Sequence, residues 1–298
     1  MTLDSPRCGI YAIVGRPNVG KSTLLNHLVG QKISITSRKP QTTRYKIHGI
    51  AQHGAAQLVF ADSPGWQRQP RSKLHKLMNQ QIDNALHEVD AVLHVIDVAG
   101  WHTDDGAIEL MIKETARPGI LIINKIDRLA TRDVLLPLIA KLQSEHAYSD
   151  YFPVCALQGT NMLALLELLA ARAPQRSPLF AADDVTDRPE RFMVAEFIRE
   201  KIARQLGDEL PYATHVVIDT FVTRGDVVHI DATIWVEKPG QKAIVIGRQG
   251  QRIKQIGSSA RLDIEKMLEQ RVYLKTWVKV RGKWTEDPAA LEIFETPE

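Results

Sequence analysis

The sequence predicts an α/β fold in two parts, a mostly parallel sheet with helices on both faces followed by a smaller α+β domain. Three observations support this prediction. Apolar runs alternate with longer polar or periodic stretches through the first 170 residues, which is typical of a parallel sheet. The alternation stops near residues 173–189, and two β-branched runs joined by a short turn follow. A length of 298 residues is also ordinary for two domains.

Five short apolar runs are the predicted strands of the first part, and each is followed by a stretch that reads as a helix. The predicted strands are Gly9–Val14, Gln57–Ala61, Ala91–Val98, Gly119–Ile123 and Tyr151–Cys155. The predicted helices are Lys21–Val29, Lys73–Glu88, Asp104–Thr115, Val134–Ser144 and Asn161–Arg172. Because a helix follows each strand, the strands are expected to lie mostly parallel.

A stretch rich in proline and aspartate separates the two parts and is predicted to be a linker. The predicted boundaries are 1–173 for the first domain, 174–190 for the linker, 191–285 for the second domain and 286–298 for an acidic tail. In the second domain we expect helices at Arg191–Leu206 and Arg252–Glu269 and strands at Thr214–Thr223, Val227–Val236 and Val272–Val280. The turn Arg224-Gly225-Asp226 joins the first two of these strands as a hairpin.

Composition excludes several classes of protein. Hydrophobic residues make up 44% and charged residues 24%, which is a globular balance and not a disordered one. Two cysteines, Cys8 and Cys155, exclude a disulfide framework, and no histidine or cysteine falls at metal-ligand spacing. The N-terminus does not resemble a signal peptide, and no apolar run is long enough to span a bilayer. We therefore expect a cytoplasmic protein.

The charge is unevenly spread along the chain. The overall net charge of +3 suggests no partner, but residues 238–283 hold 12 basic and 3 acidic side chains, a local +9. The flanking segments 183–237 and 284–298 carry −6 and −5. A concentrated positive segment can mark a nucleic-acid site, although charge by itself more often indicates a solvated helix face.

The clearest motif follows the first predicted strand. Gly15-Arg16-Pro17-Asn18-Val19-Gly20-Lys21-Ser22 matches G-x-x-x-x-G-K-[ST] and opens a predicted helix, which is the context this phosphate-binding loop requires. Its glycines let backbone N–H groups approach phosphate oxygens closely. Lys21 is expected to reach the β- and γ-phosphates, and the Ser22 hydroxyl to bind Mg²⁺.

A second motif, Asp62-Ser63-Pro64-Gly65, ends the next predicted strand. A carboxylate here can hold Mg²⁺ through water, and the Gly65 N–H can face the γ-phosphate. The D-x-x-G pattern is weak alone because aspartate and glycine are common in turns. Its position after a strand and downstream of the phosphate loop makes Asp62 and Gly65 candidate catalytic residues.

Two further motifs indicate which base is bound. Asn124-Lys125-Ile126-Asp127 ends a strand, and the Asp127 carboxylate can accept hydrogen bonds from the N1–H and the amino group of guanine. Adenine lacks this donor pair, so the expected nucleotide is GTP and not ATP. Val154-Cys155-Ala156 ends the fifth strand, and its backbone N–H groups are candidates for contact with guanine O6.

These four motifs, in this order, resemble the translation-factor-like branch of P-loop GTPases, and the G-x-P-N-V-G-K-S form resembles the Era group more narrowly. The resemblance implies that a threonine of Gln41-Thr42-Thr43-Arg44 completes Mg²⁺ and γ-phosphate coordination, with the choice between Thr42 and Thr43 left open. It also implies that Asn18 helps to bind a monovalent cation, usually K⁺.

The sequence departs from the related enzymes at two positions. The fifth motif usually begins with serine, but here it begins with Cys155, which we interpret as a small buried residue at a strand end. In Ras-like enzymes a glutamine after D-x-x-G orients the attacking water, and Trp66 occupies that position here. Tryptophan cannot polarise water, so we predict slow intrinsic hydrolysis that K⁺ or a bound partner accelerates. Trp66 is still counted among the nucleotide-site candidates.

The positive segment contains a second functional motif. Residues 244–257 fit I-G-x-x-G-x-x-I-K-x-I-G, in which glycines at a turn between two helices let a nucleic-acid backbone approach closely. The candidate RNA contacts are Ile244, Ile246, Gly247, Arg248, Gln249, Gly250, Arg252, Ile253 and Lys254. The isoleucines, with Ile256, are candidates for an apolar platform for bases, and core packing is the alternative. Nearby cations that could contact phosphate are Arg261, Lys275, Lys279, Arg281 and Lys283.

The element order of the second domain resembles a type II KH fold. A P-loop GTPase domain followed by a type II KH domain, matching from Gly9 to Lys283, resembles the Era GTPase family. The resemblance implies hydrolysis of GTP to GDP and phosphate with Mg²⁺ and K⁺, and binding of single-stranded 16S rRNA near its 3′ end during assembly of the 30S subunit. It implies a cytoplasmic monomer with peripheral contact at the inner membrane, although the sequence has no lipidation signal.

Two alternatives are open at this point. One is a ribosome-assembly GTPase with two GTPase domains, but this chain has one P-loop. The other is a non-enzymatic KH-type RNA-binding protein with a vestigial nucleotide fold. The intact motif residues argue against the second alternative. They are Lys21, Ser22, Asp62, Asn124 and Asp127.

Overall fold

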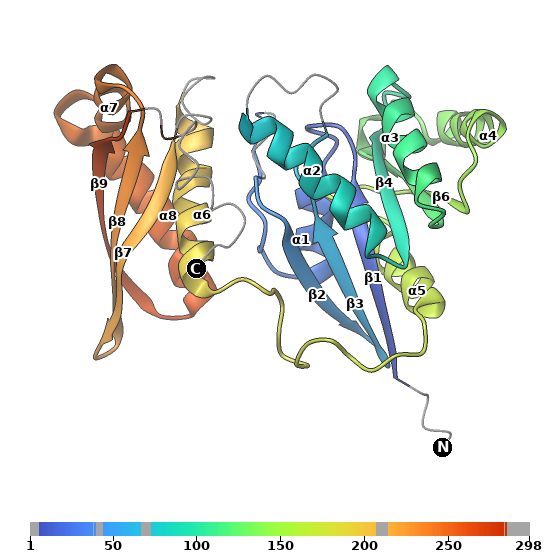
Figure 1. The fold of residues 1–298 in the computed structure, drawn as a ribbon, viewed down its shortest axis with the longest axis horizontal. Helices are drawn as coiled ribbons and strands as arrows, with labels where there is room; N and C mark the ends of the chain where they lie inside the picture. The colour runs from blue at the N-terminus through green and yellow to red at the C-terminus, as the bar shows by residue number, and fades with distance from the viewer. Residues whose placement is uncertain are drawn as a thin grey trace. The chain divides into compact units, whose positions relative to one another are not determined.

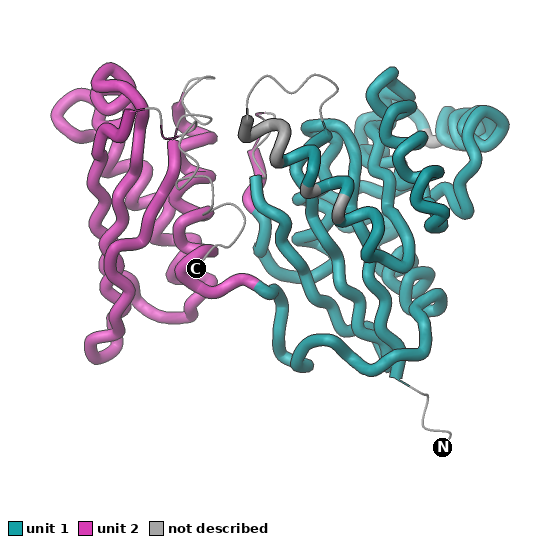
Figure 2. Tube along the Cα trace, viewed as in Figure 1, with its two compact units in different colours: residues 1–34, 43–187 teal, residues 35–42, 188–298 magenta. Residues whose placement is uncertain are grey.

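The chain forms two compact units in the computed structural model, which describes residues 6–37, 39, 44–66, 73–206, 214–282 and 284. Figure 2 shows unit 1, residues 1–34 and 43–187, and unit 2, residues 35–42 and 188–298. The segment 35–42 therefore groups with the C-terminal unit, although sequence analysis placed it in the first domain. The chain leaves unit 1 after Ser34, returns at residue 43, and leaves again after Asp187.

Unit 1 contains a six-stranded sheet in the order β2-β3-β1-β4-β5-β6. The strands are β1 Arg7–Val14, β2 Ile47–His53, β3 Ala56–Asp62, β4 Ala91–Asp97, β5 Gly119–Asn124 and β6 Asp150–Pro153. All neighbours pair in parallel except β2, which is antiparallel to β3. The mostly parallel sheet is confirmed, and its five predicted strands are present with small shifts at their ends. Sequence analysis missed β2, because its histidines, glutamine and glycine interrupt the apolar pattern.

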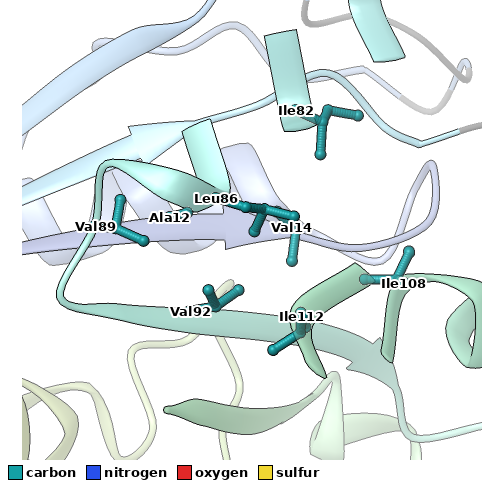
Figure 3. Packing of buried hydrophobic residues seen from close by; sticks show 8 residues of the cluster. All are labelled: Ala12, Val14, Ile82, Leu86, Val89, Val92, Ile108 and Ile112. Carbon is teal, nitrogen blue, oxygen red and sulfur yellow. The ribbon is translucent and has the colours of Figure 1, made fainter. Parts of the chain in front are cut away.

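Helices cover both faces of this sheet, as predicted. They are α1 Lys21–Val29, α2 Lys73–His87, α3 Thr103–Glu114, α4 Leu135–Glu145 and α5 Met162–Arg172. In Figure 1, α2 and α3 lie in front of the sheet and α1 and α5 behind it. Figure 3 shows how Ile82 and Leu86 of α2 and Ile112 of α3 meet Val14 and Val92 of the strands. Burial of each such aliphatic side chain contributes about 1.5–3 kcal/mol to the stability of the folded state.

Much of the predicted linker is hydrogen-bonded to unit 1. The side-chain oxygen of Gln57 accepts from the amides of Leu179 and Phe180 at 2.8 and 3.0 Å, and the Ile50 amide donates to the carbonyl of Val185 at 2.9 Å. Proline and aspartate prevent a regular element here but do not prevent these contacts. The C-terminal part of unit 2 begins at residue 188, and its first helix begins at Glu190.

Unit 2 has the predicted order of helix, hairpin, two helices and strand. Its elements are α6 Glu190–Gln205, β7 His215–Arg224, β8 Val227–Val236, α7 Pro239–Ile246, α8 Gln251–Leu268 and β9 Arg271–Val280. The sheet order is β7-β8-β9, with β7 antiparallel and β9 parallel to β8. Figure 1 shows α6 and α8 on the same side of this sheet.

The core of unit 2 lies between this sheet and its helices. Alternate residues of β8, from Val228 to Val236, are buried, as are Ile256 and Ile264 of α8. The other face of the sheet carries the intervening residues, since successive strand side chains point to opposite faces. Among the described helices of the whole chain, none is long and apolar enough to cross a membrane.

Candidate functional site

The phosphate loop lies between β1 and α1, where the sequence placed it. Gly20 has a φ of 105°, and a Cβ at this position would come within 2.3 Å of the Asn124 side-chain nitrogen, so a glycine is required. Lys21 is 7% exposed, and its Nζ donates to the carbonyls of Gly15 and Arg16 at 2.9 Å each. Burial lowers the pKa of Lys21 to about 8, although the charge of Asp62 opposes the shift.

Asp62 lies at the end of β3 and is fully buried. One carboxylate oxygen accepts hydrogen bonds from the hydroxyls of Ser22 at 3.0 Å and Ser34 at 2.8 Å. The other, Oδ1, is buried without a hydrogen-bond partner among the described residues. Burial raises the pKa of Asp62, with Lys21 and both serines acting against the rise. A buried carboxylate with a spare oxygen beside a serine hydroxyl fits Mg²⁺, which prefers oxygen ligands.

Ser34 is a site residue that sequence analysis did not single out. Asn26 of α1 holds it in place, because its side-chain oxygen accepts from the Ser34 amide at 2.8 Å and its nitrogen donates to the Ser34 carbonyl at 2.7 Å. Thr42 and Thr43, the predicted Mg²⁺ ligands, lie outside the described residues. Arg44, which follows them, is buried.

Asn124 links three of the predicted motifs. Its side-chain nitrogen donates to the carbonyl of Val19 in the phosphate loop at 2.8 Å. Its oxygen accepts from the amides of Lys125 at 2.8 Å and Ala156 at 3.0 Å. The residue that ends β5 therefore holds the phosphate loop and the loop after β6 at fixed distances from each other.

Lys125 makes a second link to the phosphate loop. Its Nζ donates to the carbonyl of Asn18 at 2.6 Å and to the carboxylate of Asp97 at 2.5 Å. Burial acts to raise the pKa of Asp97, but the Lys125 hydrogen bond and the Ala99 amide outweigh it and lower the pKa. Asp97 ends β4 and carried no motif, so sequence analysis missed it. Asn18 itself is exposed, with a left-handed backbone at φ 64°.

The residues predicted to read guanine also lie close together. Asp127 is exposed, and the Cys155 thiol donates to its carboxylate at 3.0 Å. Burial and this carboxylate raise the pKa of Cys155, so the thiol stays protonated and can donate. Ile126 is tied to the same loop, since its amide donates to the Val154 carbonyl at 3.3 Å.

The three amides proposed for guanine O6 already have partners within the chain. Val154 donates to the carbonyl of Ile123 at 2.8 Å, Cys155 to that of Thr160 at 3.3 Å, and Ala156 to the Asn124 side chain. A contact with O6 would therefore need one of these hydrogen bonds to be shared or exchanged.

The rest of the D-x-x-G motif is largely structural. The Ser63 hydroxyl donates to the carbonyl of Ile13 at 2.8 Å, Pro64 is buried, and Gly65 lies beside Pro17 of the phosphate loop. Trp66 packs against the hydrophobic cluster of α2 and α3. The slow intrinsic hydrolysis expected from a tryptophan at this position stays a prediction.

Arg16 connects the phosphate loop to α3, a contact that sequence analysis did not predict. Its Nε donates to both carboxylate oxygens of the fully buried Asp105, at 2.7 and 2.8 Å. Burial acts to raise the pKa of Asp105, but hydrogen bonds from Arg16 and from the His102 amide, with His94 nearby, lower it. Buried His94 is bonded to the Tyr148 hydroxyl at 2.6 Å and lies behind this pair.

The G-x-x-G loop joins α7 to α8, as expected for a nucleic-acid-binding turn. Gly247 has a φ of 71°, and a Cβ there would lie 2.7 Å from the Cβ of Arg252. Arg248 and Gln249 are exposed at the tip, and Gly250 precedes α8. The Arg252 guanidinium donates to the carbonyl of Ile244 at 3.0 Å, so this arginine also holds the end of α7.

The predicted apolar platform is smaller than expected. Ile244 is 44% exposed and Ile246 and Ile253 are partly buried, but Ile256 is fully buried in the core. A side chain on the inner face of α8 packs against the sheet and cannot meet a base. Lys254 is exposed beside the loop.

Comparison with known proteins agrees with this geometry. A family described as "50S ribosome-binding GTPase" matches residues 10–125, and the KH domain family matches residues 209–285. The chain is 44% identical over 295 residues to GTPase Era of Xylella fastidiosa (strain M12), covering 99% of each chain. It is 46% identical over 292 residues to GTPase Era of Pseudomonas putida (strain W619), covering 98% of this chain and 97% of that protein.

Two solved structures are similar over nearly the whole chain. One is an Aquifex aeolicus Era variant bound to GDP and AlF4−, with a TM-score of 0.93. The other is Era in complex with MgGDPNP and nucleotides 1506–1542 of 16S ribosomal RNA, with a TM-score of 0.92. Each is 37% identical and covers 97% of this chain and 98% of its own. With the P-loop sheet, the nucleotide motifs and the KH loop all in place, this chain belongs to the GTPase Era family.

Proposed function

We propose that the protein binds GTP together with Mg²⁺ and hydrolyses it to GDP and phosphate. The observation that carries this proposal is the buried Asp62 carboxylate, which has one oxygen on Ser22 and Ser34 and the other without a partner. Its neighbour Lys21 holds a charge that burial disfavours. Such a pair of opposite charges in a dry site suits a phosphate and a divalent cation.

Each residue has a role in this proposal. The Lys21 ammonium exchanges its two carbonyl partners for β- and γ-phosphate oxygens, and the P-loop amides hold the remaining oxygens. Ser22, Asp62 through water, and Thr42 or Thr43 hold Mg²⁺, which when bound neutralises charge on the phosphates. Asn18 helps to bind K⁺ beside the phosphate loop. Asp127 reads the guanine edge.

We further propose that unit 2 binds single-stranded rRNA near the 3′ end of 16S rRNA during assembly of the 30S subunit. The exposed Arg248 at a close-approach glycine turn, with Lys254 and Ile244 beside it, supports this role. The similar Era structure that holds nucleotides 1506–1542 of 16S rRNA supports the choice of small-subunit rRNA as the partner. The protein is expected to act as a cytoplasmic monomer with peripheral contact at the inner membrane.

Nucleotide state and RNA binding are proposed to be coupled. Ser34 of unit 1 donates to Asp62, and two residues later Thr36 of unit 2 donates its amide to Glu200 of α6 at 2.9 Å. GTP with Mg²⁺ would order residues 33–44 and the segment after Gly65, and hydrolysis would release them. By linkage, GTP and RNA then favour each other's binding equally.

The test of the nucleotide assignment uses two variants of the full chain. Lys21→Ala should abolish GTP turnover measured with Mg²⁺ and K⁺. Asp127→Asn should lower the affinity for GTP and raise the affinity for XTP. Xanthine carries an oxygen at the position of the guanine amino group, and the asparagine amide can donate a hydrogen bond to that oxygen. A wild-type protein that binds the 16S 3′-end oligonucleotide but turns over no GTP would instead favour the non-enzymatic alternative.

The K⁺ assignment has a separate test. GTP turnover should rise when K⁺ replaces Na⁺, and Asn18→Ala should remove that rise. Fast turnover without K⁺, unaffected by Asn18→Ala, would exclude it.

A further inference from the structure

The outward face of β9 carries alternating cationic and aromatic side chains. We call this set the β9 strip; it consists of Arg271, Tyr273, Lys275, Trp277 and Lys279. Tyr273 is 48% and Trp277 45% exposed. The alternate residues Val272 and Val278 are buried against the helices, and Thr276 lies beside Gly257 of α8. The β9 strip therefore lies on the face of the sheet opposite α8.

Residues of β8 and of the hairpin turn lie beside the β9 strip on the same face of the sheet. In the parallel register of β8, His229 lies opposite Tyr273, with ring centroids 5.2 Å apart, and Asp231 lies opposite Lys275. The Lys275 ammonium lies over the Tyr273 ring at 5.4 Å. Asp226, at the hairpin turn, is 3.9 Å from Arg271, and both are largely exposed, so this pair is weak.

Further along the face, towards β7, aromatic residues are covered by the chain itself. The Arg281 guanidinium lies over the Trp235 ring at 4.4 Å, and Trp284 packs beside His215 with centroids 5.6 Å apart. Trp284 is fully buried, unlike Tyr273 and Trp277. The two exposed rings thus remain accessible on a face where other large rings are covered.

Edge protection explains part of the β9 strip but not all of it. In the described sheet β9 pairs with β8 alone, and lysines on an edge strand discourage pairing with other chains. This accounts for Lys275 and Lys279. It does not account for a tyrosine and a tryptophan exposed at two outward positions of the same strand, on either side of Lys275, because exposing these rings to water costs free energy.

We propose that the β9 strip binds single-stranded RNA as a second contact surface, separate from the Gly247–Gly250 loop. Unpaired bases stack on exposed aromatic rings, and the interleaved cations fit the phosphates between them. The charge supports nucleic acid as the occupant, because the 10 residues of β9 include three charged side chains, Arg271, Lys275 and Lys279, and all three are cationic. The proposal rests on the RNA-binding function proposed above and extends it.

The two surfaces belong to the same unit, and β9 is an edge strand of the sheet that the structure describes there. A KH loop clamps about four nucleotides. A longer single-stranded RNA that continues beyond the loop would pass β9, the edge strand, and reach Trp277 and Tyr273 on the outer face of the sheet. The positive segment 238–283, which the sequence presents as one stretch, is thereby divided into a loop surface and a sheet surface.

The test compares a 5-nucleotide and a 12-nucleotide single-stranded RNA from the 16S 3′ end, each labelled with fluorescein, by anisotropy with the full chain. The double variant Tyr273→Ser/Trp277→Ser should bind the 12-mer about tenfold or more weakly than the wild type, because the loss of one stacked base has an effect of that order. Its affinity for the 5-mer should not change, because the loop binds that RNA. Lys275→Gln should reduce the salt slope for the 12-mer by about 0.7.

Leu262→Ser is the matched control, because Leu262 is an exposed apolar residue of α8 outside the β9 strip. It should change neither affinity, and thermal unfolding checks that each variant is folded. Unchanged 12-mer affinity in the double variant overturns the proposal, and this is also the result expected if the face binds the acidic tail or a protein. If Arg248→Glu still weakens the 5-mer in that case, the proposed RNA function stands without the β9 strip. If the wild type binds neither RNA, both proposals fail.

Discussion

Lys21 carries its charge into a site from which water is almost excluded. Its ammonium contacts two carbonyl oxygens of its own loop, which are weaker partners than phosphate oxygens. Burial lowers its pKa from the usual 10.5 to about 8, so the protonated form is held at a cost in the nucleotide-free protein. We expect a bound nucleotide to relieve this cost, because its phosphates supply negative charge.

The pH dependence of nucleotide binding follows from this shift. Above pH 8 much of the nucleotide-free protein has a neutral Lys21, while bound phosphates favour the ammonium. GDP binding at pH 9 should therefore take up a proton, and affinity should fall as pH rises above 8. Calorimetry at pH 7 and pH 9, in two buffers of different ionisation enthalpy, measures this uptake. A binding enthalpy independent of the buffer at pH 9 would contradict it.

Cys155 contacts a residue of the predicted guanine site, which its interpretation as a small buried strand-end residue did not suggest. Its thiol donates a hydrogen bond to Asp127, the residue proposed to read guanine, so we expect Cys155 to orient that carboxylate. Cys155→Ser should keep GDP affinity near the wild-type value, and Cys155→Ala should weaken it by about 2- to 10-fold, the effect of one lost hydrogen bond. Fluorescence titration with a labelled GDP measures both. The control is Cys8→Ala, which removes the other buried cysteine. Equal affinity of the serine and alanine variants would rule out this role.

At the scale of elements, α3 is attached to the phosphate loop by a buried ion pair. Asp105 in the first turn of α3 holds Arg16, so the position of the loop depends on how α3 packs on β4. A buried pair is costly to break, because the remaining partner is left as an unpaired charge.

Removing this carboxylate should destabilise the fold. Asp105→Ala should lower the free energy of unfolding by about 3 kcal/mol or more. The double variant Arg16→Met/Asp105→Leu should lose less free energy of unfolding than the summed losses of Arg16→Met and Asp105→Leu measured separately. Urea denaturation measures both. Because the folded pKa of Asp105 is depressed, its contribution is present above its unfolded pKa near 3.8 and is lost as pH falls through the folded pKa. Additive losses in the double variant would show that the pair is not coupled.

Across the whole molecule, the proposed coupling between the nucleotide site and RNA binding depends on the segment that follows Ser34, because residues 35–42 group with unit 2. Arg204 of α6 donates to the carbonyl of Thr36 at 2.8 Å and to its hydroxyl at 2.7 Å, and Glu200 accepts from its amide. We therefore expect a change at Ser34, beside Asp62, to reach within two residues a segment that is hydrogen-bonded to α6.

The coupling can be measured as a ratio of affinities. Wild-type protein should bind the 16S 3′-end RNA more tightly with a GTP analogue than with GDP, and Arg204→Gln should bring that ratio towards one. It should also speed amide exchange at Thr36. Arg191→Gln, on the same helix but bonded to Ile218 of β7, is the control and should leave the ratio unchanged. Equal RNA affinity of the wild type with the GTP analogue and with GDP would show that nucleotide state and RNA binding are not coupled.

Apart from β2, the mostly parallel sheet, the order of elements in both units and the four nucleotide motifs could be predicted from the sequence, because they are encoded by local periodicity and by residues at fixed spacing next to strand ends. The sequence also located the KH loop. Tertiary structure alone decided the partners of those motifs. Ser34 reaches Asp62 across 28 residues, Asp97 reaches Lys125 across 28, and Arg16 reaches Asp105 across 89. It also decided which cations of the positive segment lie beside the loop and which lie on the open sheet face. No local pattern records such contacts, because strand order and register bring these side chains together only when the sheet is formed.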